Sequence, residues 1–244
     1  MPSTQSLETL RAQATRIVAF TGAGISAESG IPTYRGDEGV WNRYDPDKYA
    51  NIDYFIHDPA YYWRFFQEVR APVLHRAKPN PGHQALARME RQGALRAVIT
   101  QNIDGLHQMA GSERVLELHG NTRRIACLKC RRIYDLDEVT RLLASGIPPV
   151  CSACRGVLKP EVVFFGEALP QAVLAEAMQE AMTCDLFLAV GSSLVVQPAA
   201  SLPVHAKQNR AKLVIINKQA TPLDSMADLV IRDSASTVLG ELSG

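Results

Sequence analysis

Short apolar runs alternate with amphipathic stretches along most of this chain. Six apolar runs predict strands, the last two more weakly: residues 17–20, 97–100, 186–190, 213–216, 115–118 and 228–231. Helical periodicity lies between several of them, for example at residues 82–92 and 171–182. Strands that alternate with helices are typical of a parallel sheet covered on both faces. We therefore predict an α/β fold with a doubly wound, Rossmann-like sheet.

Two stretches interrupt this alternation and predict a smaller domain. Residues 38–77 are rich in aromatic side chains and have the pattern of a helical module, whereas residues 123–159 hold four of the five cysteines. We expect a large domain built from residues 1–37, 78–122 and 160–244. Residues 38–77 and 123–159 would form the small domain, with one helical and one cysteine-bearing module.

The bulk composition is that of an ordinary globular protein. Of 244 residues, 46% are hydrophobic and 21% are charged, and the formal net charge is +1. This balance gives the chain no general attraction for nucleic acid or for a membrane surface. No apolar run reaches the roughly 18 residues of a transmembrane helix, and the first residues lack the apolar core of a signal peptide. We expect a cytoplasmic protein without membrane partners.

Four cysteines have the spacing of a metal site. Cys127 and Cys130 form one Cys-x2-Cys pair, and Cys151 and Cys154 form a second pair after a 20-residue spacer. This pattern predicts one structural Zn²⁺ held by four thiolates, with no open position for a catalytic water. Two disulfides or four free thiols are the alternative, which the absence of a secretion signal disfavours. The fifth cysteine, Cys184, lies in a strand-like run and is expected to be a small buried hydrophobe.

Basic residues flank the first cysteine pair: Arg123, Arg124, Lys129, Arg131 and Arg132. A zinc-ribbon module that binds nucleic acid would place such residues against phosphates. A solvated basic face that offsets the thiolate charge is the simpler interpretation. A ribbon alone would also leave the rest of the chain unexplained, so we expect no specific nucleic-acid binding.

A glycine-rich segment follows the first predicted strand. The run Gly22-Ala23-Gly24-Ile25-Ser26-Ala27 matches the G-x-G-x-x-G/A dinucleotide fingerprint. Pro32, shortly after it, stops any helix after about two turns, whereas an ordinary dinucleotide site continues into a long helix. A dehydrogenase would also carry an acidic residue about 20 positions later, at a strand end. Asp45 and Asp47 lie near that distance but in a loop, which argues against a dehydrogenase.

Polar clusters follow the carboxyl ends of the predicted strands. In an open α/β sheet these ends share one crevice, where ligands bind. His119 ends the weak strand at residues 115–118, and an imidazole is well suited to move a proton near neutral pH. His119 is therefore the candidate general base. The clusters themselves occupy residues 21–35, Gln101-Asn102-Ile103-Asp104, Gly191-Ser192-Ser193 and Asn217-Lys218.

Together these segments resemble the sirtuins, a family of NAD-dependent protein-lysine deacylases, of the small bacterial or archaeal type. The resemblance covers nearly the whole chain, in the family's order. It rests on Gly22-Ala23-Gly24-Ile25-Ser26, Glu28-Ser29-Gly30-Ile31-Pro32, Gln101-Asn102-Ile103-Asp104, His119-Gly120, the four cysteines, Val163-Phe164-Phe165-Gly166-Glu167, Gly191-Ser192-Ser193 and Asn217.

The resemblance implies that NAD is a consumed co-substrate. The residues that would contact it are Gly22, Ala23, Gly24, Ser26, Thr33, Tyr34, Arg35, Trp41, Gln101, Asn102, Ile103, Asp104, Gly191, Ser192, Ser193, Asn217, Lys218 and Ala235. A non-catalytic NAD-sensing protein and a mono-ADP-ribosyl transferase remain alternatives.

The resemblance also implies an acyl-lysine peptide as the second substrate. The peptide would add as a strand between the segment near Val195 and a second segment, Val163, Phe164, Phe165, Gly166 and Glu167. Its acyl oxygen would attack C1′ of the nicotinamide ribose, and nicotinamide would leave. His119 would then act as general base on a ribose hydroxyl, giving free lysine and O-acyl-ADP-ribose.

The acyl preference is predicted from one helix. Sirtuins that remove succinyl or malonyl groups carry a Tyr-x-x-Arg pair, and the matching positions here hold Phe66 and Val69. Arg70 follows directly, but about 100° further around an α-helix. An acidic acyl group would therefore be buried without a partner. We expect acetyl and other neutral acyl groups to be preferred.

Overall fold

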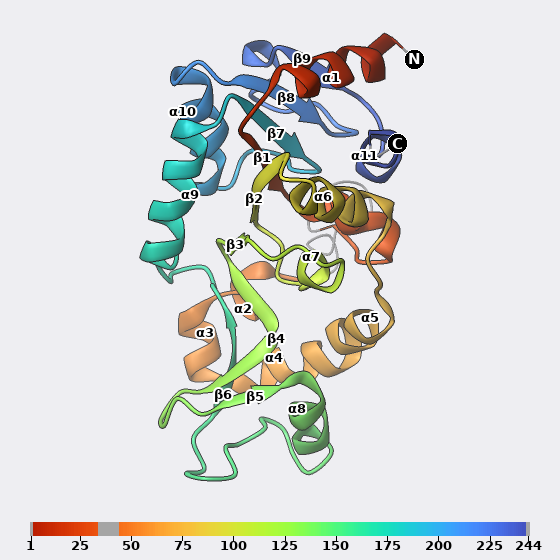
Figure 1. Cartoon of the computed structure of the whole chain (residues 1–244). Coiled ribbons are helices and arrows are strands. Elements are labelled where there is room, and N and C mark those ends of the chain that lie inside the picture. Colours follow the sequence, from red (N-terminus) through yellow and green to blue (C-terminus); the bar gives the residue numbers. More distant parts are fainter. Residues whose placement is uncertain (1, 34–43, 243–244) are drawn as a thin grey trace.

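The computed structural model describes residues 2–33 and 44–242 (Figure 1). Within them, six parallel strands form the main sheet in the order β3-β2-β1-β7-β8-β9. This confirms the predicted Rossmann-like architecture. The strands are β1 (Ile17–Thr21), β2 (Leu95–Thr100), β3 (Val115–Glu117), β7 (Leu186–Val190), β8 (Lys212–Ile216) and β9 (Leu229–Ile231).

The order of the strands reverses between β1 and β7. The chain adds β2 and β3 on one side of β1, then returns to add β7, β8 and β9 on the other. Thr21 at the end of β1 is in register with Val190 of β7 and with Thr100 of β2. The three strands end level with one another. The connections after β1 and β7 pass over opposite faces of the sheet, which opens a crevice at the carboxyl ends of these strands.

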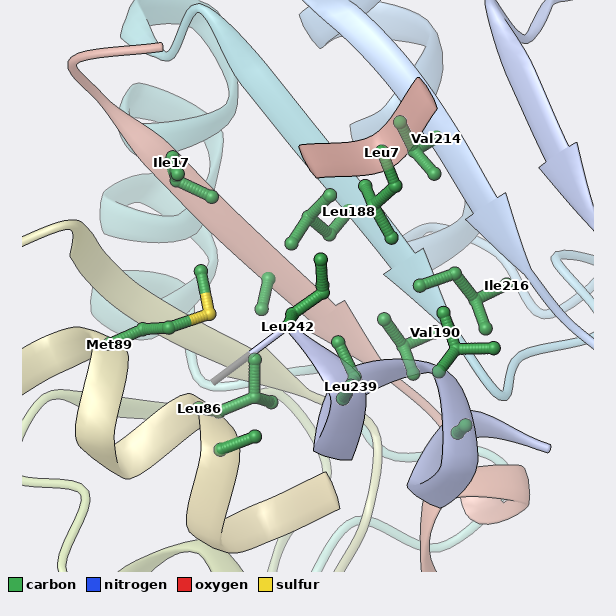
Figure 2. Packing of buried hydrophobic residues seen from close by; sticks show 14 of the residues in the cluster. Leu7, Ile17, Leu86, Met89, Leu188, Val190, Val214, Ile216, Leu239 and Leu242 are labelled. Carbon is green, nitrogen blue, oxygen red and sulfur yellow. The ribbon is translucent and has the colours of Figure 1, made fainter. Parts of the chain in front are cut away.

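Helices cover both faces of the sheet. On one face, α1 (Pro2–Gln13), α6 (Pro81–Arg91) and α11 (Ala235–Glu241) pack on the strands. Figure 2 shows Leu239 of α11 beside Val190 of β7, with Leu86 of α6 and Leu188 of β7 in the same cluster. On the other face lie α9 (Gln171–Thr183) and α10 (Leu202–Gln208), with short 3-10 turns at Ala199–Ser201 and Asp224–Met226. The two predicted helices correspond to α6 and α9.

The segments that interrupt the alternation fold against each other. The first forms α2 (Pro46–Tyr49), α3 (Ile52–His57), α4 (Pro59–Phe65), a π-helical turn (Phe66–Arg70) and α5 (Ala71–Arg76). The second contributes β4 (Gly120–Cys127), β5 (Ile133–Asp135), α8 (Leu136–Leu143) and β6 (Leu158–Val162). The three strands pair antiparallel in the order β5-β4-β6.

One aromatic-rich core joins these two segments. Trp63 of α4 is fully buried, and its indole Nε1–H donates to the carbonyl of Leu158 on β6 at 2.9 Å. Phe55, Phe66 and Ile125 lie in the same cluster. The domain boundaries given above stay a prediction, but this shared core explains how distant segments form one unit. Within the described residues, no helix is both long and apolar enough to span a membrane.

Candidate active site

A cleft of about 610 Å³ lies beyond the carboxyl ends of the central strands. Every polar cluster predicted from the sequence contributes to its lining. The predicted residues that line it are Gly22, Ala23, Gly24, Thr33, Gln101, Asn102, Ile103, His119, Val163, Phe164, Phe165, Gly166, Glu167, Gly191, Ser192, Ser193 and Asn217.

Bare backbone forms the floor of this cleft, where β1 and β7 end. The Gly24 N–H donates to the Gly191 carbonyl at 2.8 Å. A Cβ on Gly24 would lie 2.6 Å from the Cα of Gly191, and Gly191 itself has a φ of +62°. Only glycine fits at either position. After Gly22 the chain forms a short 3-10 helix, Ala23–Ser29, that ends at Gly30, so the predicted early stop is observed.

A buried polar network supports the floor from below. The Asn102 side-chain amide donates to the Gly22 carbonyl and to Ser26 Oγ, both at 3.1 Å. Ser26 Oγ in turn donates to Asp104 Oδ2 at 2.7 Å. Burial raises the pKa of Asp104, against the opposing hydrogen bonds from the Leu106 N–H and from Ser26. Ser26 therefore positions Asn102 and Asp104.

A smaller pocket of about 60 Å³ opens beside the cleft. Asp104 and Val69 line it together with Ile31 and Pro32. The pocket shares Ala23, Asn102 and Ile103 with the main cleft, so the two spaces adjoin.

His119 has its tautomer fixed by the backbone. Its Nδ1 lies 3.0 Å from the carbonyl oxygen of Gln101, which can only accept a hydrogen bond. Nδ1 therefore carries the proton, and Nε2 is the basic nitrogen. Burial lowers the pKa of His119, and the hydrogen bond to Gln101 only partly opposes this. The imidazole is thus neutral near pH 7, as a general base requires.

Gly120 lets the chain turn from His119 into β4. It has a φ of +75°, and a Cβ at this position would lie 1.9 Å from the Glu161 carbonyl oxygen. Beside it, the Val163 N–H donates to the His119 carbonyl at 2.9 Å. The backbone of residues 163–167 therefore runs directly alongside the candidate base.

Some predicted site residues do not line the cleft. Phe66 is fully buried in the aromatic core, Ala235 is buried at the start of α11, and Lys218 and Val195 are exposed outside the lining. Ser26 lies beneath the floor, and Val69 lines only the small pocket. Tyr34, Arg35 and Trp41 lie outside the described residues.

Arg70 lines both the cleft and the small pocket. It is the last residue of a π-helical turn, Phe66–Arg70, where the Ala71 N–H donates to the Phe66 carbonyl five residues back. The expected rotation of about 100° between Val69 and Arg70 assumed α-helical geometry, which this turn does not have. Tyr49 and Tyr62 also line the cleft without any signal in the sequence pattern.

The four predicted cysteines converge in one cluster. Their Sγ atoms all lie within 4.8 Å of one another, with 3.5 Å between Cys127 and Cys154 and 3.6 Å between Cys130 and Cys151. A disulfide would need about 2.05 Å. A tetrahedral Zn²⁺ with Zn–S bonds of about 2.3 Å needs sulfur atoms about 3.8 Å apart, so the cluster fits one structural zinc.

The two cysteine turns have matching backbone geometry. Arg131 and Arg155, each directly after the second cysteine of its pair, have φ values of +63° and +61°. Their N–H groups donate back to the carbonyls of Cys127 and Cys151. The Tyr134 hydroxyl donates to Cys151 Sγ at 3.0 Å, and this hydrogen bond lowers the pKa of that thiol to about 6. A thiolate is the form that zinc binds.

Comparison with known proteins identifies the family. The Sir2 family model matches residues 22–198, from the glycine floor to Pro198 in the cleft lining. The chain belongs to the Sir2 family. It is 49% identical over 232 residues to an Archaeoglobus fulgidus protein named NAD-dependent protein deacylase 2, covering 95% of this chain and 91% of the relative. It is 51% identical over 225 residues to NAD-dependent protein deacetylase 1 of Pyrobaculum aerophilum, covering 92% and 87%.

Solved Sir2 structures share the fold. One, described as a structural basis for the mechanism and regulation of Sir2 enzymes, matches with a TM-score of 0.91 and 47% identity over 99% of this chain and 96% of its own. A complex of Sir2 with a p53 peptide and NAD⁺ matches with a TM-score of 0.91 and 40% identity, covering 98% and 96%. The sirtuin resemblance inferred from the motifs is therefore confirmed.

Proposed function

We propose that this chain is an NAD-dependent protein-lysine deacetylase that releases nicotinamide and forms O-acetyl-ADP-ribose. One observation carries the proposal. The neutral His119 imidazole, with its basic Nε2, lies in the same cleft as a floor of bare glycine backbone. A site that held NAD only as a ligand would not need a general base. The names of the relatives support the same activity.

NAD is proposed to lie along the ends of β1, β7 and β8. The absence of side chains at Gly22, Gly24 and Gly191 allows the pyrophosphate to approach the main chain. Ser193 and Asn217 line the cleft further along β7 and β8, where the adenosine half would lie. Asp104, in the adjoining small pocket, is placed to accept hydrogen bonds from the nicotinamide carboxamide.

The proposed reaction begins with attack of the acyl oxygen on C1′ of the nicotinamide ribose. A C–O bond forms, the C1′–N bond breaks, and nicotinamide leaves with the electron pair. His119 Nε2 then removes a proton from a ribose hydroxyl, whose oxygen attacks the former amide carbon. Collapse of that adduct with water releases the lysine amine. The Gln101 carbonyl stabilises the imidazolium that forms at His119.

The acyl-lysine peptide is proposed to lie along residues 163–167. The Phe165 N–H donates to the Ala50 carbonyl at 2.7 Å, and the Phe165 carbonyl accepts from the Ile52 N–H at 3.0 Å. Phe165 is therefore paired on one side with residues 50 and 52, just before a turn at Gly166, where φ is +91°. The substrate strand is proposed to add on the other side. Phe165 is 43% exposed, so its ring is available to a ligand. Val195, which is 46% exposed and directly precedes Val196 of the cleft lining, is proposed to contact the other side of the peptide.

Acetyl and other neutral acyl groups are proposed as the groups that the enzyme removes preferentially. Phe66 and Val69, at the positions of the acidic-acyl Tyr-x-x-Arg pair, offer neither a hydroxyl nor a charge. Arg70 reaches the cleft, but at its junction with the small pocket, and its guanidinium carbon lies 5.6 Å from the centre of the Phe65 ring. Arg70 is therefore the residue that any test of acyl preference must include.

The decisive experiment incubates the protein with NAD and acetyl-lysine peptide. We expect nicotinamide release matched by peptide deacetylation. NADH absorbance would indicate a dehydrogenase, and NAD binding without turnover a sensor. A second panel compares acetyl, propionyl, butyryl and succinyl peptides on the native protein and on Arg70→Met. Succinyl turnover at or above acetyl turnover would overturn the neutral preference, and its loss in Arg70→Met would assign the anion to Arg70.

The zinc cluster is proposed to be structural only. Four thiolates fill the coordination shell, so no position is open for substrate or water. Two of the neighbouring basic residues are engaged within the protein. Arg123 donates to the carbonyls of Asp104 and Leu74, and Arg124 pairs with Glu161 at 2.8 Å. These contacts support the proposal that the protein does not bind nucleic acid specifically.

A further inference from the structure

A buried lysine lies behind the peptide-binding segment. Lys159 is on β6, outside the lining of the cleft, and its side chain is 9% exposed. Burial lowers the pKa of Lys159, and the contact with Glu167 opposes that effect. Burying an ammonium is costly unless its hydrogens are all engaged. A side chain that only filled space at this position would be apolar.

The ammonium group contacts both ends of residues 162–167. Lys159 Nζ donates to the Val162 carbonyl at 2.8 Å and to Glu167 Oε2 at 2.8 Å. Between these two contacts it lies 4.3 Å from the centre of the Phe164 ring. A single cation therefore links the residue before the peptide-binding segment to the residue that ends it.

Glu167 connects the Lys159 ammonium to the backbone of Phe164. The same Oε2 that contacts Lys159 accepts the Phe164 N–H at 2.8 Å, and the Glu167 N–H donates to the Phe164 carbonyl at 3.0 Å. Phe164 is thereby held on its inner side, while Phe165 projects toward solvent. Val163, one residue earlier, bonds the His119 carbonyl. The lysine thus fixes the shape of the segment in register with the candidate base.

We propose that Lys159 is a positioning residue for the acyl-lysine peptide. Through Glu167 and the Val162 carbonyl it fixes residues 163–165, and the turn at Gly166 that follows them, in the conformation to which a substrate strand adds. The proposal rests on the proposed function for its substrate. It makes Lys159 a determinant of peptide affinity, without contact to the peptide or to NAD.

The test compares Lys159→Met, which keeps the length and loses the charge, with Lys159→Arg, which keeps the charge. We expect Lys159→Met to raise KM for the acetyl peptide about tenfold, the factor that corresponds to ~1.4 kcal/mol. The Kd for NAD should stay within twofold of the native value, and Lys159→Arg should recover most of the peptide affinity. Lys212→Met is the control, because it breaks an ion pair of similar length, 3.0 Å to Asp228, in the other sheet and with an exposed lysine.

A second measurement does not depend on the reaction. Amide hydrogen exchange should accelerate at residues 163–166 in Lys159→Met, while exchange in β1 and β7 stays unchanged. Glu167→Gln, which leaves Lys159 bonded to Val162, should give the same local effect if Lys159→Met fails to fold. Unchanged exchange and unchanged peptide KM would overturn the proposal. If exchange accelerates locally in Lys159→Met but the native protein has no deacetylase activity, the result contradicts the proposed function and leaves the positioning role of Lys159 intact.

Discussion

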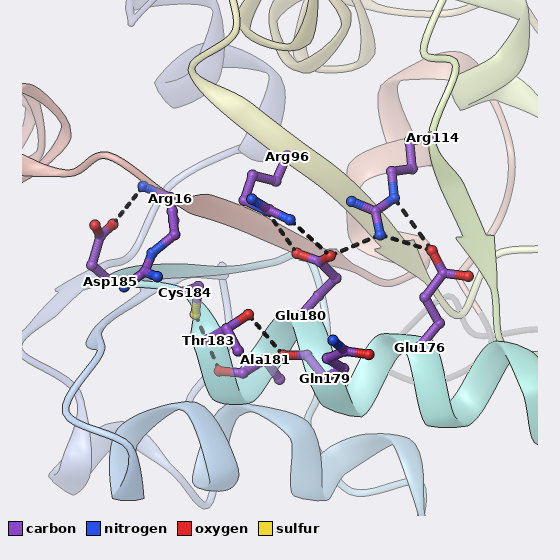
Figure 3. Close-up of polar contacts among 10 residues, drawn as sticks. All are labelled: Arg16, Arg96, Arg114, Glu176, Gln179, Glu180, Ala181, Thr183, Cys184 and Asp185. Carbon is purple, nitrogen blue, oxygen red and sulfur yellow. Dashed lines mark hydrogen bonds and ion pairs between the residues drawn. The ribbon is translucent and has the colours of Figure 1, made fainter.

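Arg96 on β2 and Glu180 on α9 form an ion pair, with 3.0 Å between Nε and Oε2 (Figure 3). Arg114, directly before β3, reaches the other oxygen of the same carboxylate at 2.7 Å. The Glu180 side chain is 6% exposed, whereas both arginines remain partly in solvent. One buried carboxylate therefore fastens α9 to two neighbouring strands of the sheet.

Replacing this carboxylate should destabilise the fold. We expect Glu180→Gln to lower the free energy of unfolding by ~2 kcal/mol, in the range of a hydrogen bond to a charged group. The matched control is Glu176→Gln, which removes a carboxylate that also pairs with Arg114 but is 45% exposed. An exposed pair contributes less than ~1 kcal/mol, so the control should lose less. Urea denaturation of the three proteins measures the difference, and equal losses would contradict this account.

The same ion pair should give the stability a characteristic pH dependence. Burial alone would raise the pKa of Glu180, but hydrogen bonds and charge from Arg96 and Arg114 lower it overall. A lowered acid pKa stabilises the fold above the unfolded-state value of about 4.3. That contribution is lost as the pH falls through the lower folded-state value. The gap in stability between the native protein and Glu180→Gln should therefore shrink below about pH 4.

The sequence predicted the sheet well because the relevant signals are local. Six short apolar runs match the six parallel strands, since a strand buried on both faces must be apolar throughout. The glycine floor was also predicted from the sequence. Gly22, Gly24 and Gly191 have to be glycine because a Cβ there would collide with the backbone, so the requirement is visible in the sequence. His119 could be placed at a strand end, but not its tautomer, which depends on the carbonyl of Gln101.

Other features depend on contacts between distant residues and left no local signal. Arg70 lines the cleft from a π-helical turn, which no spacing rule indicates. Nothing in the sequence around Lys159 distinguishes it from a surface lysine. In the structure, β6 places its ammonium beside Glu167. Short strands such as β5 acquire their stability from the shared aromatic core rather than from their own three residues.

Removing the His119 imidazole should abolish turnover without loss of NAD binding. We expect His119→Ala to lower kcat by at least ~100-fold, the usual contribution of a general base. The exposed His75→Ala is the control and should be unaffected. Because burial lowers the pKa of His119, the native kcat/KM should fall only below pH 6.5, where the base becomes protonated. A kcat/KM that already falls above pH 6.5 as the pH is lowered would contradict the assignment of a buried base.

Loss of one zinc ligand should empty the cluster. Cys151→Ser leaves three thiolates and should reduce bound zinc well below one per chain, with lower thermal stability. Cys184→Ser is the matched control: Cys184 is buried in a different core, and burial raises its pKa to about 12, so it is no thiolate ligand. Elemental analysis of the purified proteins separates the two variants. Full zinc content in Cys151→Ser would refute the four-cysteine site.

A methyl group at Gly191 should weaken NAD binding, because it disturbs the floor of the cleft as well as straining the backbone. Its Cβ would lie 2.4 Å from the Ile25 backbone nitrogen, in addition to the strain of a φ of +62°. Gly93→Ala isolates that strain, because Gly93 has a φ of +75° and open space around it. We expect Gly93→Ala to cost ~1 kcal/mol of stability with native NAD affinity. Gly191→Ala should weaken NAD binding by more than about tenfold, or ~1.4 kcal/mol. Calorimetric titration with NAD measures both, and native affinity in Gly191→Ala would show that the floor does not contact the co-substrate.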